Sequence, residues 1–82
     1  MNANDVYAFV LRLKAAAERD TNIELAEQLD NALHLGSSAL EILGRIRVIV
    51  TSNREAITIL LGPSSQREVE EIIVFVDKAY GR

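Results

Sequence analysis

The chain has 82 residues with no cysteine, one histidine and a net charge of −3 at pH 7, and its isoelectric point lies near 5.0. This length predicts one domain over residues 1–82, whose core is so small that stability depends on stapling, a bound metal or self-association. The lack of cysteine excludes disulfides, and one histidine leaves too few nitrogen ligands for an ordinary zinc site. The acidic balance argues against general nucleic-acid binding, which needs a basic patch.

The first predicted helix runs from about Asp5 to Glu18, with Asn4 as its N-cap. Its apolar side chains recur at the spacing of an α-helix and form one face. That face consists of Val6, Phe9, Val10, Leu13, Ala16 and Ala17.

The second predicted helix begins with a capping box over Thr21–Glu24 and runs to about Leu35. Its inward face is predicted to contain leucine and alanine, while its outward face is acidic. We expect Gly36 to adopt the left-handed conformation that commonly ends a helix. A further capping box over Ser38–Glu41 predicts that the next helix starts almost at once. The inward residues are Leu25, Ala26, Leu29, Ala32 and Leu33.

The third predicted helix is the longest, from about Ala39 to Leu61. A capping-box pattern over Ser52–Glu55 favours two helices broken near Ser52, but the apolar residues keep one phase across this point. That common phase favours a single helix about 34 Å long at 1.5 Å per residue, with Thr51 to Asn53 as the place for any kink. The apolar stripe comprises Ala39, Ile42, Leu43, Ile46, Ile49, Val50, Ala56, Ile57, Leu60 and Leu61.

Asn53 is the polar exception within this stripe. A buried asparagine can fix the register or oligomeric state of packed helices. It can also sit at a kink, where its amide bonds to backbone groups that the kink frees. The sequence leaves both interpretations open.

The last predicted helix follows Gly62-Pro63, a pair that ends the preceding helix, and starts with a capping box over Ser65–Glu68. Short connections between consecutive helices predict an all-α, up-down four-helix bundle. The long third helix overhangs its partners, so we expect a homodimer to complete the bundle. The predicted oligomer interface consists of Ile46, Val48, Ile49, Asn53, Ile57, Ile59, Val74 and Phe75.

A helix-turn-helix is the alternative function, because residues 32–42 resemble the A-x-x-x-G-x-S-x-x-x-I pattern of many bacterial repressors. The resemblance implies a small DNA-binding regulator with its turn at Gly36. The chain departs from the pattern at Asn31, Ser37 and Arg45, where apolar residues are usual. Glu41 would also place an acid against the phosphates. We therefore expect nucleic acid not to be the partner.

His34 is the candidate general base, with Asp30 one helical turn earlier to orient it. A histidine in the last turn of a helix is, however, already favoured by the helix dipole. We expect no catalytic site, metal or cofactor. The arginines of the third helix, Arg45, Arg47 and Arg54, are expected to lie along the edges of the apolar stripe rather than to bind an anion.

Residues 1–10 lack the basic segment of a signal peptide. The most apolar region, residues 42–61, contains four charged side chains that a membrane span would have to bury. We expect a soluble, cytoplasmic interaction or structural module.

Overall fold

Five helices make up the computed structural model of the chain, which describes residues 1–81. They are α1 (Ala3–Arg19), α2 (Ile23–Leu35), α3 (Ala39–Ser52), α4 (Arg54–Leu61) and α5 (Ser65–Ala79), and no strand occurs in this part of the chain. The all-α class is therefore confirmed. The radius of gyration of 11.8 Å is close to the value of about 12 Å expected for a compact domain of this length.

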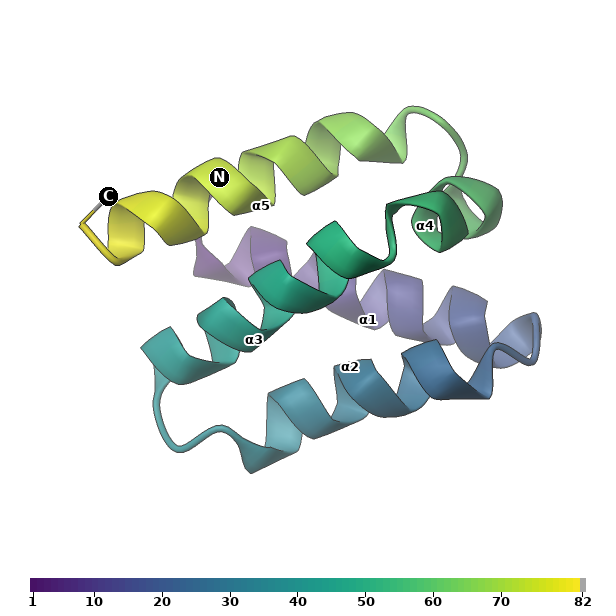
Figure 1. Cartoon of the computed structure of the whole chain (residues 1–82), viewed down its shortest axis with the longest axis horizontal. Coiled ribbons are helices and arrows are strands. Elements are labelled where there is room, and N and C mark those ends of the chain that lie inside the picture. The colour runs from purple at the N-terminus through teal and green to yellow at the C-terminus, as the bar shows by residue number, and fades with distance from the viewer. Residues whose placement is uncertain (82) are drawn as a thin grey trace.

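The helices pack in two layers around one core (Figure 1). The hairpin of α1 and α2 forms one extensive contact, and α3 packs against both α2 and α5. In the view of Figure 1, α3 runs in front of α1, between α2 and α5. The short α4 contacts α5 and α1 as well as α3.

The single long helix expected over residues 39–61 is wrong, because the helix breaks at Asn53. Asn53 has φ −124° and ψ 29°, and it ends α3 and precedes α4. Its side-chain amide donates to the carbonyl oxygen of Ile49 at 2.8 Å and to Oε1 of Gln28 at 3.3 Å. The kink interpretation of Asn53 is thus confirmed. Ser52, the cap in the alternative of two helices, lies in the last turn of α3.

The break redirects α4 onto the core. Ile57 of α4 is completely buried there together with Ile46 and Val50 of α3. Packing of α4 against α1 and α5 covers apolar surface that a straight helix was expected to leave overhanging. The burial of Ile57 provides the physical reason for the break, since the packing of an apolar face outweighs the local tendency to continue a helix.

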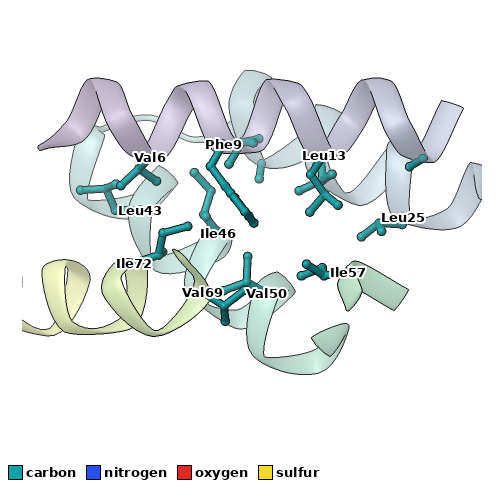
Figure 2. Close-up of a cluster of buried hydrophobic side chains, with 14 of the residues drawn as sticks. Val6, Phe9, Leu13, Leu25, Leu43, Ile46, Val50, Ile57, Val69 and Ile72 are labelled. Carbon is teal, nitrogen blue, oxygen red and sulfur yellow. The ribbon is translucent and has the colours of Figure 1, made fainter. Parts of the chain in front are cut away.

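The core draws side chains from all five helices (Figure 2). Phe9 projects from α1 into the centre of the cluster, towards Ile46 of α3. Within residues 1–81, every buried side-chain nitrogen or oxygen has a hydrogen-bond partner. The fully buried large side chains of the core are Phe9, Leu13, Leu25, Leu29, Ile46, Ile57, Ile72, Val6, Val10, Val50, Val69 and Val76.

The caps of the first two helices differ from those expected. Asn2, rather than Asn4, caps α1, and its side chain and that of Asp5 accept each other's backbone N–H groups. Asn22, rather than Thr21, caps α2 by accepting from the backbone N–H of Leu25. Thr21 lies in the turn before it with φ +57°. Asparagine and threonine are both good caps, so sequence alone could not distinguish neighbouring candidates.

Glycine occurs at residues 62 and 36 for different physical reasons. Gly62 has φ +92° and ends α4 in a conformation that glycine favours. Gly36, by contrast, has φ −74° and ψ 137°, so the expected left-handed conformation is wrong. A β-carbon at Gly36 would lie 2.4 Å from Cγ1 of Ile42, and close approach explains this glycine instead.

The start of α5 also differs from its predicted capping box. Ser65 is the first residue of α5 rather than its cap, and it is buried. Its hydroxyl donates to the carbonyl oxygen of Gly62 at 2.6 Å. Gln66 donates to Oγ1 of Thr58 at 2.7 Å, which ties α5 to α4 across the turn.

Candidate interaction surface

Two of the residues expected at an oligomer interface lie in the core of the single chain. Ile46 and Ile57 both have an exposed fraction of 0%. They therefore offer no surface to a second molecule in this conformation. Ile59, in contrast, is one of the most exposed apolar side chains and lies on the outer side of α4.

The other expected interface residues fall on two separate surfaces. Val48, Ile49 and Asn53 line a groove between α2 and α3. Val74 and Phe75 line a different hollow on α5, beside Met1. The structure thus does not bring the exposed residues of the third and last predicted helices together into one patch.

The α2–α3 groove is the largest surface hollow described, with a volume of about 680 Å³. Ile49 and Val48 give it an apolar part, and Val48 is 61% exposed. The hydrogen bond between Asn53 and Gln28 fixes the alignment of the two helices. The residues that line the groove are Glu24, Gln28, Asn31, Ala32, Arg45, Val48, Ile49, Ser52 and Asn53.

The sequence did not predict the α2 side of this groove; it indicated only that the outward face of this helix is acidic. Glu24, Gln28 and Asn31 recur at i, i+4 and i+7 and so share one face of α2. This shared face can be recognised from the spacing in the sequence. The hydrogen bond between Gln28 and Asn53 cannot, because it depends on how α2 lies against α3.

Opposite charges lie towards the two ends of the groove. Arg45 of α3 forms an ion pair with Glu41 of its own helix at 3.0 Å. Glu24, in the first turn of α2, makes no ion pair within residues 1–81. The groove therefore has a guanidinium paired with Glu41 towards one end and a carboxylate without an ion pair towards the other.

The turn between α2 and α3 is held by Glu41. Its carboxylate accepts from the backbone N–H of Ser37 at 2.8 Å and from the Ser37 hydroxyl at 2.6 Å. These hydrogen bonds, together with Arg45, lower the pKa of Glu41 to about 2. The Ser38 hydroxyl accepts from the backbone N–H of Glu41 at 3.2 Å, as expected for the cap of α3. The Glu41 side chain reaches Ser37 rather than Ser38, so the box is completed one residue earlier.

The remaining arginines of residues 42–61 also pair with acids of the same chain. Arg47 contacts Asp77 of α5 at 2.9 Å, and Arg54 contacts Glu70 of α5 at 2.6 Å. Each pair joins α5 to α3 or α4. These contacts support the interpretation of the arginines as structural side chains along the edges of the apolar stripe.

His34 lies at the exposed end of α2. Its Nδ1 is 2.9 Å from the carbonyl oxygen of Asp30 and 3.2 Å from the Asp30 carboxylate. Lys14 of α1 binds the same carboxylate at 2.9 Å, which lowers the pKa of Asp30 and raises that of Lys14. The carboxylate thus links α1 to α2, in addition to its contact with His34.

Within residues 1–81, no group of three or more histidine, aspartate or glutamate side chains is arranged to hold a metal ion. None of the helices over the same residues is long and apolar enough to cross a membrane. Comparison with protein-family models, with curated proteins and with solved structures finds no match for this chain. Any functional inference therefore rests on the surface of the molecule itself.

Proposed function

We propose that the chain is a protein–protein interaction module that forms a homodimer, and that the α2–α3 groove is its docking surface. The observation that carries the proposal is the exposure of Val48 above a groove with an apolar part and a polar rim. Protein interfaces commonly combine an apolar centre with a polar rim and are enriched in arginine. The proposal assigns the protein to the cytoplasm and gives it no catalytic role and no cofactor.

Sedimentation velocity from micromolar to millimolar protein tests the proposal. We expect the sedimenting mass to rise from one chain to two as concentration increases. Val48→Asp should prevent this rise without loss of helical circular dichroism, because an exposed residue can carry a charge. Val74→Asp is the matched control: Val74 is 52% exposed but lies on the separate α5 hollow, so this variant should still associate. A monomer at every concentration would contradict the proposal.

The helix-turn-helix alternative has one observation in its favour, the close approach of Gly36 to Ile42. Against it, Asn31, Ser37 and Arg45 are exposed rather than packed between the helices. Fluorescence anisotropy with duplex DNA at low salt provides the test. We expect no binding, since the chain has a net charge of −3 and Glu41 would lie against the phosphates.

A further inference from the structure

We propose that the two copies pair through an antiparallel α3–α3 contact, with Arg45 of each copy bound to Glu24 of the other. This inference rests on the proposed self-association and specifies its geometry. The carrying observation is that Arg45 and Glu24 line the same groove but do not pair with each other within one chain, where Arg45 contacts Glu41 and Glu24 makes no ion pair within residues 1–81.

The separation of Arg45 and Glu24 follows from the alignment of α2 and α3. Gln28 lies beside Asn53, as their hydrogen bond shows. Arg45 precedes Asn53 by about two helical turns, and Glu24 precedes Gln28 by one turn on the oppositely directed helix. At 1.5 Å per residue, this places the two backbones roughly 18 Å apart along the groove. An intrachain ion pair between Arg45 and Glu24 is thereby excluded.

When two copies are related by a two-fold axis, the separation of Arg45 and Glu24 in one chain allows each residue to meet its opposite charge in the other copy. An isologous dimer places the same surface of both copies face to face, so the Arg45 end of one groove meets the Glu24 end of the other. With the axis between Val48 and Ser52, each Arg45 lies towards the partner's α3 C-terminus, where Glu24 also lines the groove. Two identical ion pairs then form across the interface.

The side chains near the axis suit this arrangement. Val48 of one copy would face Ser52 of the other, and the small serine leaves room for the valine. Arg45 does not need to release Glu41, because a guanidinium has five N–H donors and can bind two carboxylates. In the single chain the pair with Glu41 already holds the Arg45 side chain on this face. The dimer contact therefore needs little rearrangement.

Charge-reversal variants that are defective alone but associate when mixed provide the test. Arg45→Glu places two glutamates opposite each other at both contacts, and Glu24→Arg places two arginines there. We expect each variant alone to dimerise at least about tenfold more weakly, since like charges across an interface are strongly unfavourable. In an equimolar mixture, the heterodimer contains two pairs of opposite charge, one original and one reversed, and sedimentation should show association near that of the unaltered protein.

The mixture separates this proposal from effects on folding. Each variant keeps its own intrachain defect in the mixture, so only a contact between copies explains recovery. If the unaltered protein dimerises but the mixture stays as weak as its components, the proposed pairing is wrong while the homodimer stands. If the unaltered protein never dimerises, both proposals fail. Circular dichroism melting of each variant confirms that folded chains are compared.

Discussion

Gly36 and Ile42 approach so closely that a β-carbon on the glycine would lie 2.4 Å from Cγ1 of the isoleucine. The contact joins the end of α2 to the first turns of α3. Gly36 has ordinary backbone angles, so alanine would meet no conformational strain there. Side-chain crowding alone should decide the effect of a substitution.

We therefore expect Gly36→Ala to destabilise the fold by about 1–3 kcal/mol, the usual cost of overpacking. Urea denaturation followed by circular dichroism measures this change. Ile42→Ala removes the atom that crowds the new methyl group, and in that background Gly36→Ala should cost little. An equal cost in both backgrounds would show that the contact with Ile42 is not the cause.

Gly44 offers a contrasting case, because the nearest atom is at the far end of the exposed side chain of Tyr80. A β-carbon there would lie 2.5 Å from the hydroxyl oxygen of Tyr80, which donates to the carbonyl oxygen of Leu40. In a Tyr80→Ala background, Gly44→Ala should stabilise the protein by about 1 kcal/mol through helix propensity. With Tyr80 present, displacement of its ring should cancel most of that gain. Thermal unfolding of the unaltered protein, the two single variants and the double variant gives the double-mutant cycle that measures this difference.

Ile46 and Val48 are two residues apart on α3 but differ completely in environment. Ile46→Asp should abolish cooperative unfolding, because a buried carboxylate costs several kcal/mol against a total stability of about 4–12 kcal/mol for this length. At a protein concentration where the chain is monomeric, Val48→Asp should leave the melting transition nearly unchanged. Calorimetry on both variants makes the comparison, and a cooperative transition for Ile46→Asp would refute the assignment of the core face.

Asn53 should contribute more than either of its hydrogen bonds alone. Asn53→Ala loses the contacts with Ile49 and Gln28, and we expect destabilisation of about 1–2 kcal/mol. Gln28→Ala loses only the longer contact and should cost less than half as much. Urea denaturation gives both values. A larger loss for Gln28→Ala would mean that the bond to the Ile49 carbonyl oxygen is unimportant.

The pH dependence of stability should contain a contribution from Glu41. The pKa of Glu41 in the folded state, about 2, lies below the ordinary value of 4.5, so folding favours the ionised carboxylate over its protonated form. Its stabilisation is complete above about pH 4.5 and is lost as pH falls towards 2. The difference in melting temperature between the unaltered protein and Glu41→Gln should shrink over this range. Ser37→Ala, which removes one donor, should reduce that pH-dependent difference.

Local sequence signals were sufficient for the helices and their apolar faces. Residues such as Val6, Leu29 and Val50 were assigned to apolar faces from spacing alone, and all are buried. The break at Asn53 was not predictable in this way, because the apolar phase continues across it. What decides the break is the packing of α4 against α1, more than thirty residues earlier in the chain.

The candidate surface was only partly predictable for the same reason. The exposure of Val48 follows from its position opposite the apolar stripe of α3. Its separation from Val74 depends on how α5 packs, and the groove depends on the alignment of Gln28 with Asn53. Such relationships join distant segments, whereas capping and periodicity report on neighbouring residues.

At the junction around Asn53, the number of residues is constrained more strictly than their types. A single residue separates α3 from α4, and both Val50 and Ile57 must face the core on either side of it. One inserted residue would turn the side chains of α4 by about 100° around the helix axis, and a deletion would turn them the other way. An insertion would bring Ala56 to the core position of Ile57, and a deletion would bring Thr58 there. Among related sequences, substitutions at exposed Glu55 are therefore expected to be common, while the number of residues between Val50 and Ile57 stays fixed.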